Sequence, residues 1–244
     1  MQQADEAQKH EMLAVALDKV RFSWPGALHD TLDIPHFSMS QAERVFVSGP
    51  SGCGKSTLLG LIAGILTPTC GQVLVQGTAL ESLGSAGRDR FRGEHIGFIF
   101  QQFNLVPYLS VVENVLIPCR FSALRRKRAE KQGSDLGEVA AMLLQRLDLE
   151  KSLWRKPVRT LSIGQQQRVA CARALIGQPE LIIADEPTSA LDTDRRVAFL
   201  HLLLEECTSQ GTALLFVSHD ELLAEAFPRT VRMQDINLVK GEES

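Results

Sequence analysis

The stretch "RVFVSGPSGCGKSTLLGLIAG", residues 44–64, places an apolar run, a glycine-rich loop and a leucine-rich segment directly after one another. Residues 44–49 form a short run of strand-forming side chains that ends in glycine. Residues 55–64 carry an apolar face at helical spacing. The stretch therefore predicts a strand, a tight loop and a helix, in that order.

The loop fits the pattern G-x-x-x-x-G-K-[ST], which is typical of phosphate binding between a strand and a helix. Glycines lack a Cβ, so the backbone can curl with its N–H groups inward and lie close against an anion. The following helix adds unpaired N–H groups and the positive end of its dipole. We predict that the loop binds the phosphates of ATP through Gly49, Pro50, Ser51, Gly52, Cys53, Gly54, Lys55, Ser56 and Thr57.

Two side chains of this loop have specific expected roles. Lys55 would reach the β- and γ-phosphates, and the Ser56 hydroxyl would ligate Mg²⁺. The alternative is an ordinary glycine-rich turn before a helix. Cys53 also has two interpretations: it is a small residue without a role, or its oxidation blocks nucleotide binding.

Composition and charge limit the class of protein. The chain has 244 residues, of which 44% are hydrophobic and 23% charged, which suits a folded domain with a sizeable core. The net charge of −3 gives no reason to expect a nucleic-acid partner. The longest apolar run, residues 58–66, is far shorter than the roughly 20 residues that span a bilayer. With no signal-peptide core at the polar N-terminus, we expect a cytoplasmic protein.

Its five widely spaced cysteines are expected to be reduced thiols.

Strand-like and helical runs alternate along most of the chain. Further strands are predicted at 13–24, 71–77, 96–101, 181–186, 213–220 and in the closing run 230–233, and helices at 140–149, 165–175 and 193–209. Such alternation implies an α/β fold with a parallel sheet and helices on both faces. Residues 104–174 contain few strand-like runs. We therefore expect a polar tail at 1–12, an α/β core at 13–103 and 175–240, and a helical insertion at 104–174.

The run "LIIADE", residues 181–186, supplies carboxylates at the end of a buried strand. Ligands bind at the C-terminal edge of the strands in open α/β sheets. Asp185 is expected to hold Mg²⁺ and Glu186 to act as the base that polarises the attacking water. An acidic strand end is common by itself, so this interpretation depends on the phosphate loop.

A second charged feature is "RRKR" at 125–128. It is either a solvated helix surface or a contact with acidic lipid or a membrane partner.

Four further motifs occur in a fixed order: "GFIFQQFNLVP" (97–107), "LSIGQQQR" (161–168), "ADEPTSALD" (184–192) and "FVSHD" (216–220). Their order and spacing resemble those of the ATP-binding-cassette (ABC) ATPases, over about residues 12–240. More narrowly, "LSVVENVLIP" and "QQQRVACARAL" are similar to the LolD/MacB type, the ATPases of lipoprotein-releasing and macrolide-exporting assemblies. The resemblance implies a P-loop NTPase (RecA-like) core with an N-terminal antiparallel β subdomain and an inserted α-helical signature subdomain.

The resemblance also implies roles for single residues. Trp24 would lie against the adenine ring, unless it only covers a sheet edge. Gln101 would touch Mg²⁺ and water, and His219 would contact the γ-phosphate. With Lys55 and Glu186, these two residues complete the expected catalytic set. Asp192 would lie near a twofold axis and couple two sites.

The signature "LSIGQ" departs from the usual LSGGQ of the family at Ile163. By resemblance, Ser162, Gly164 and Gln165 act in trans on the γ-phosphate that the other subunit holds. Isoleucine is tolerable if its backbone φ is negative and its side chain points away, and strained if φ is positive.

The resemblance implies partners as well. Two copies would pair head to tail around two ATP molecules, and each pair would dock on a separate integral-membrane permease at the inner face of the cell membrane. The alternatives are an ATP-dependent regulator of a membrane complex that transports nothing, and a soluble ABC protein of DNA repair or translation.

Overall fold

The computed structural model describes residues 13–239. The chain packs into two compact units. One holds the chain up to Arg92 and again from Ala213 onward, and the other holds Gly93–Thr212. Each unit has a buried apolar interior of its own, with Leu17 and Phe46 fully buried in the first and Ile183 in the second.

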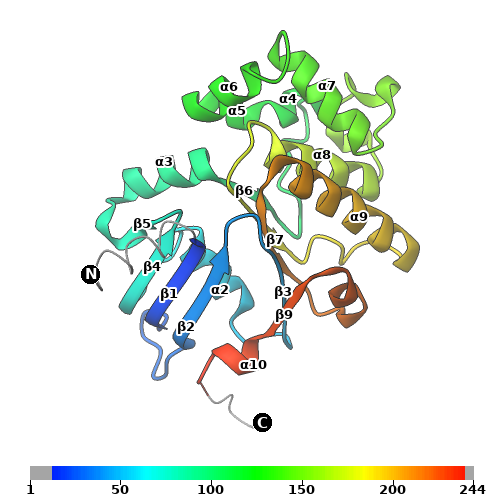
Figure 1. Cartoon of the computed structure of the whole chain (residues 1–244). Helices are drawn as coiled ribbons and strands as arrows, with labels where there is room; N and C mark the ends of the chain where they lie inside the picture. Colours follow the sequence, from blue (N-terminus) through cyan, green and yellow to red (C-terminus); the bar gives the residue numbers. More distant parts are fainter. Residues whose placement is uncertain (1–12, 240–244) are drawn as a thin grey trace. The chain divides into compact units, whose positions relative to one another are not determined.

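An antiparallel sheet opens the first unit. Its strands are β1 (Leu13–Phe22), β2 (Leu32–Ser40), β4 (Cys70–Val75) and β5 (Thr78–Ala79), in the order β2-β1-β4-β5 (Figure 1). β1 lies between two partners, with Leu17 opposite Phe37 of β2 and Val73 of β4. These side chains are buried, so the register follows the apolar pattern. The expected strands at 13–24 and 71–77 are confirmed as β1 and β4.

The strand β2 was not predicted, because Pro35 and His36 interrupt its apolar alternation. Proline cannot donate to a hydrogen-bond ladder and is tolerated at sheet edges. β2 is an edge strand, and Pro35 is exposed. The edge position therefore explains how this sequence forms a strand.

Three parallel strands complete the sheet structure of this unit. β3 (Arg44–Ser48) lies between β8 (Ala213–Val217) and β9 (Arg229–Arg232). The rings of Phe46 and Phe216 stack with centroids 5.9 Å apart, on neighbouring strands. The expected strands at 44–49 and 213–220 and the closing strand are confirmed.

Five helical segments belong to the first unit in whole or in part. These are α2 (Lys55–Ile62), η1 (Leu80–Ser82), α3 (Ser85–His95), η4 (Glu221–Ala226) and α10 (Met233–Ile236). α2 is the helix predicted at 55–64, and its side chains are largely buried. α3 has no buried residue and was not predicted, since it lacks an apolar face.

Two parallel strands, six α-helices and two short 3-10 helices, η2 (Lys151–Leu153) and η3 (Val158–Thr160), lie in the second unit, residues 93–212. The strands are β6 (Ile96–Ile99) and β7 (Leu181–Asp185), which confirm the expected runs at 96–101 and 181–186. The helices are α4 (Val111–Val115), α5 (Ile117–Phe121), α6 (Ala123–Glu130), α7 (Leu136–Arg146), α8 (Ile163–Leu175) and α9 (Thr193–Gln210). α7, α8 and α9 correspond to the three helices predicted at 140–149, 165–175 and 193–209.

The helix α8 packs very closely on β6 at Gly97. A Cβ at this position would lie 2.3 Å from the carbonyl oxygen of Ala174, far inside van der Waals contact. Only glycine permits this approach. The close approach fixes the signature helix against the strand that leads to Gln101.

Arg125 shows that the "RRKR" run is not a uniformly solvated surface. Its side chain is 2% exposed, and the guanidinium donates to the carbonyls of Ile176 (Nε, 2.8 Å) and Ala174. Burial lowers the pKa of Arg125 to about 10. The arginine therefore caps the C-terminal end of α8 from inside the unit, where a cation complements the helix dipole.

The division of the chain into a core and a helical insertion at 104–174 stays a prediction. No helix among residues 13–239 is both long and apolar enough to cross a membrane.

Candidate functional site

The phosphate loop lies in the first unit, between β3 and α2. Gly52 and Gly54 have φ angles of 82° and 96°, which are strained for any residue with a side chain. A Cβ at Gly54 would also lie 2.6 Å from Leu32 Cδ2 of β2. Both glycines are thus required by the backbone, and their curl is what the sequence motif predicts.

Lys55 begins α2 and folds back over the loop. Its Nζ donates to the carbonyls of Gly49 (2.7 Å) and Pro50 (2.9 Å), and the residue is only 7% exposed. The helix has Gly54 as its N-cap, no side-chain cap and no acidic residue in its first turn. Its first N–H groups and the ammonium group consequently present one positive surface, which suits an anion.

Four other predicted loop residues lie around this surface. Pro50, Ser51 and Ser56 are exposed, whereas Thr57 is 8% exposed. Cys53 is partly exposed, and its Sγ lies 2.7 Å from where a Cβ on Gly49 would be. The thiol therefore packs against the glycine that opens the loop.

His219 is brought to the loop by strand pairing. Val47 of β3 lies opposite Val217 of β8, so the residues that follow both strands lie at the same edge. A cavity of about 260 Å³ is lined by Gly49, Pro50 and His219 together with Arg232 and Met233. Sequence reasoning missed the last two residues, since the short run around them carries no motif.

Trp24 lies in the turn between β1 and β2 and is 49% exposed. Its ring meets Phe22 edge-on, with centroids 5.1 Å apart and planes at 88°. A perpendicular contact with one neighbouring ring leaves at least one face of the half-exposed indole available for stacking. The position fits an aromatic platform as well as a sheet-edge cover.

The carboxylates lie in the second unit. Asp185 is the last residue of β7, and Ile99 of β6 lies opposite Ala184, so Gln101 follows the neighbouring strand at the same edge. Glu186 has a φ of 43°, a left-handed conformation uncommon for a residue with a side chain. Such conformations cluster at functional sites. This backbone conformation was not predicted from the sequence.

Ser162 is the N-cap of α8 and forms a capping box with Gln165. The Gln165 N–H donates to Ser162 Oγ (3.3 Å), and the Ser162 N–H donates to Gln165 Oε1 (2.9 Å). The serine hydroxyl accepts here, so its own proton remains available to an incoming oxygen. Gly164 occupies the first turn of the same helix.

Ile163 is the first residue of α8, does not have a positive φ, and is 52% exposed. Isoleucine is therefore tolerated at this position of the signature, because its backbone φ is not positive. The backbone is unstrained and the side chain points to solvent.

Gln167 is a contact that sequence reasoning missed. It is fully buried, and its Nε2 donates to the carbonyl of Pro187 at 3.0 Å. This bond ties the signature helix to the residue that follows Glu186. Asp192, in turn, is the N-cap of α9, accepting from the Arg195 N–H at 3.1 Å, and pairs with the Arg195 guanidinium at 3.2 Å.

The residues expected to hold Mg²⁺ offer a hydroxyl, an amide oxygen and a carboxylate: Ser56, Gln101 and Asp185. Hard oxygen donors of this kind are the ligands that Mg²⁺ prefers, and few protein ligands suffice because the ion keeps several waters. Within residues 13–239, no group of three His, Cys, Asp or Glu side chains could hold a metal ion by itself. The donor set therefore fits a magnesium ion that also binds phosphate oxygens.

Comparison with known proteins gives consistent matches. The family model described as ABC transporter matches residues 32–189. The chain is 39% identical over 208 residues to the lipoprotein-releasing system ATP-binding protein LolD of Hydrogenovibrio crunogenus, covering 85% of this chain and 87% of that protein.

Solved structures agree with the sequence matches. MJ0796, described as a dimeric bacterial ABC transporter cassette and in one state bound to ADP and Pi, matches with a TM-score of 0.76 at 33% identity, over 89% of this chain and 93% of its own. CbiO1 from Clostridium perfringens, described as part of the ABC transporter complex cbiONQ, matches with a TM-score of 0.73 at 26% identity, over 86% and 79% of the two chains. The expected fold class, a P-loop NTPase core with an antiparallel β subdomain and an inserted helical subdomain, is confirmed.

Proposed function

The chain belongs to the ABC transporter family as an ATP-binding subunit and ATPase, and we propose that it drives a permease of the lipoprotein-releasing or macrolide-exporting type. The similarity to LolD, whose name describes a lipoprotein-releasing system, supports this type. The transported substrate would then be handled by the membrane subunit, while this chain supplies the energy of ATP.

The assignment of ATP as ligand rests mainly on the phosphate loop and the beginning of α2. Lys55 lies over the loop carbonyls, and the first turn of α2 has no side-chain cap. When phosphates enter, the ammonium group exchanges two neutral carbonyl partners for anionic oxygens, which form stronger bonds. Trp24 would add stacking on the adenine ring.

The catalytic roles follow from the strand ends. Ser56, Gln101 and Asp185 would hold Mg²⁺, which when bound neutralises phosphate charge. Glu186, which directly follows β7 and has a left-handed backbone, would take the proton of the attacking water. His219, at the edge next to the loop, would donate to the γ-phosphate oxygen.

A second copy is expected to complete each site. Ser162 and Gly164 lie at the N-terminal end of α8, where N–H groups and a hydroxyl proton can meet a phosphate oxygen. The dimer described for MJ0796 supports the pairing of two cassettes. Head-to-tail copies would each give Ser162, Gly164 and Gln165 to the ATP of the other, and Asp192 would couple the two sites. ATP then favours the closed pair, and hydrolysis releases it.

The protein would bind the permease and so be located at the inner face of the cell membrane. A regulator that dimerises on ATP without transport is the second candidate function. The two differ in one measurement: substrate release from membranes by the reconstituted complex. Transport that requires both ATP and Glu186 supports the first proposal. Normal ATP hydrolysis by a complete complex that moves no lipoprotein or other amphiphile would support the regulator instead.

A further inference from the structure

Charge is distributed very unevenly along this chain. Residues 104–174 contain thirteen lysines and arginines against six carboxylates, a net charge of +7. Because the whole chain carries −3, the remainder carries −10. Such an asymmetry points to a surface that meets an anionic partner.

The "RRKR" run explains little of this excess. Arg125 is buried against carbonyls, Arg126 pairs with Glu130 at 2.9 Å, and Arg128 is bound by Glu180. Burial opposes ionisation of Glu180, but hydrogen bonds from His95 and Arg128 outweigh it and lower the pKa of Glu180 to about 2. Three of the four charges of this run thus already have a partner within the unit.

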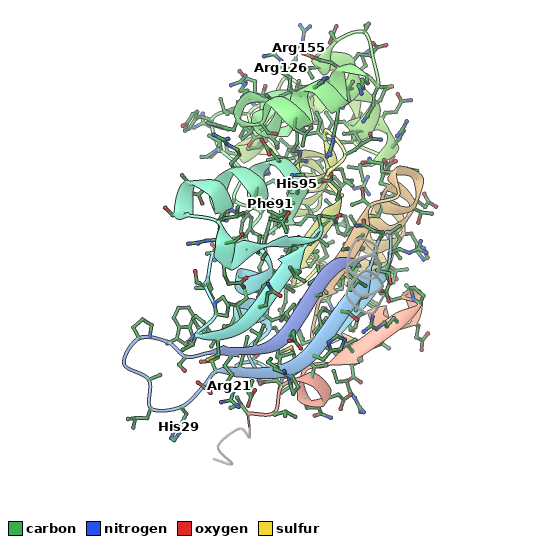
Figure 2. All side chains as sticks on the ribbon, turned by 60° about the vertical axis from the view of Figure 1, so that its left-hand side comes forward. Arg21, His29, Phe91, His95, Arg126 and Arg155 are labelled. Atoms are coloured by element: carbon green, nitrogen blue, oxygen red, sulfur yellow. The ribbon has the colours of Figure 1, made fainter. Side chains whose placement is uncertain are left out.

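The unsatisfied cations gather on another segment. Lys151, Arg155, Lys156 and Arg159 are all exposed, and none of them forms an ion pair with a carboxylate of residues 13–239. Figure 2 shows Arg155 at the outer end of the helices of this unit. Because they are exposed and not paired with a carboxylate of the described residues, these side chains are accessible to a partner.

Backbone hydrogen bonds hold this segment in place. The Val111 N–H donates to the carbonyl of Lys156 (3.1 Å), the Val112 N–H to that of Trp154 (3.2 Å), and the Val158 N–H to that of Leu109 (3.1 Å). The cations therefore project from a fixed ribbon beside residues 107–112. Tyr108, 74% exposed, lies on that neighbouring segment.

A fifth exposed cation, Arg120, lies on α5, the helix that directly follows α4. Glu113 and Arg155 line a groove of about 550 Å³. Hydrogen bonds from Ser110 lower the pKa of Glu113, and the charge of Arg120 lowers it further. Next to Arg120, Phe121 is 87% exposed. We call the five cations Arg120, Lys151, Arg155, Lys156 and Arg159, with Tyr108 and Phe121, the basic rim.

We propose that the basic rim binds the anionic phospholipid headgroups of a membrane directly. Two carboxylates close to the rim residues in the chain, Glu113 and Glu150, already accept hydrogen bonds from Ser110 and Ser152. The cations are spread along a rim and not gathered in a pocket, which suits many headgroups better than one compact anion. Exposed aromatic side chains among cations are typical of membrane interfaces. An acidic segment of a partner protein is the alternative that the test must separate.

The expected affinity follows from the number of charges. Each lysine or arginine near an anionic bilayer contributes ~1 kcal/mol, or about fivefold in partition coefficient. Removing two rim cations should therefore weaken binding about 25-fold, and reversing their charge should weaken it more. The attraction should disappear at ~1 M salt, where the screening length is only about 3 Å.

The test uses the full chain and vesicles without any permease. Flotation with phosphatidylcholine vesicles is compared with flotation on phosphatidylcholine mixed with phosphatidylglycerol. The rim variant Arg155→Glu/Arg159→Glu is compared with the control Lys19→Glu/Arg90→Glu, which changes the net charge equally at exposed positions of the other unit. We expect wild type and control to bind only the anionic vesicles, and the rim variant to lose at least about 25-fold.

Several results would overturn the proposal: equal binding to both vesicle types, equal binding by the rim variant, or equal loss in the control. Loss of permease binding by the rim variant, without vesicle binding by the wild type, would identify an acidic protein segment as the partner. None of the rim residues is among those assigned to the ATP site. Its variant should keep the ATPase rate in solution, so that failure here leaves the proposed function untouched.

Discussion

The amine of Lys55 lies 2.7 Å from the carbonyl oxygen of Gly49, so the lysine of the phosphate loop bonds to the residue that opens the loop. The contact keeps a buried cation satisfied while no phosphate is present, at the place where phosphate is expected. Removal of this amine should therefore affect ATP binding more than folding.

Lys55→Ala should strongly weaken ATP binding with little effect on folding. Hydrogen bonds to charged groups contribute about 1.5–3 kcal/mol, so the affinity should fall roughly 10- to 150-fold. Titration calorimetry with ATP measures the loss, and thermal unfolding checks the fold. Lys19→Ala, an exposed lysine in the same unit, serves as the control. Unchanged affinity in the Lys55 variant would remove the loop from the ATP site.

Glu186→Gln should bind ATP normally, lose ~10²–10⁴ in turnover, and accumulate as a dimer with ATP. The amide preserves shape but cannot accept the proton of water. Gel filtration with ATP and a phosphate-release assay give the two readings. A Glu186→Gln protein with normal turnover would show that another group is the base.

The backbone at Glu186 leads to a separate prediction on stability. At a φ of 43°, a side chain is unfavourable by about 1–2 kcal/mol and glycine is not. Glu186→Gly should therefore raise the free energy of unfolding by up to about 1 kcal/mol while hydrolysis stops. Chemical denaturation measures it, and Ala184→Gly, within β7, should be destabilising instead.

Trp24 can be followed by its own fluorescence, because the chain has only two tryptophans. If the indole stacks on adenine, ATP should change Trp24 emission, and Trp24→Ala should lose about 1–3 kcal/mol of binding energy. The other indole, Trp154, donates to the Leu149 carbonyl at 3.0 Å. Trp154→Phe should keep the ATP-dependent change in fluorescence. If this variant loses the change while Trp24→Ala keeps it, the stacking role of Trp24 is refuted.

Acid should destabilise the protein in part through Glu180. Its pKa in the folded state, about 2, lies below the ordinary 4.5, so its contribution to stability is full above about pH 4.5 and is lost toward pH 2. Glu180→Gln should be less stable than wild type at neutral pH, and the difference should shrink through that window. Denaturation curves over this range test the linkage; a constant difference would contradict it.

Much of the site was predictable because its signals are local. The end of a strand in glycine, the curled loop and the beginning of a helix all lie within about a dozen residues. The positive φ angles of Gly52 and Gly54 are therefore indicated by the local sequence pattern. Asp185 at a strand end and Ser162 before a helix follow the same logic. Edge strand β2, helix α3 and the conformation of Glu186 were not predictable, since pairing partners and strain leave no periodic pattern.

The sequence by itself determined the chemistry: which residues carry hydroxyl, carboxylate, amide and ammonium groups, and their place at the ends of strands and helices. Only the tertiary structure decided their surroundings. It buried Arg125 against the carbonyls of α8, bonded Gln167 to Pro187, and brought His219 beside Gly49 through the pairing of β3 with β8. The reason is physical: side-chain type and local spacing are written in the chain, whereas burial and hydrogen-bond partners depend on segments that meet only after folding.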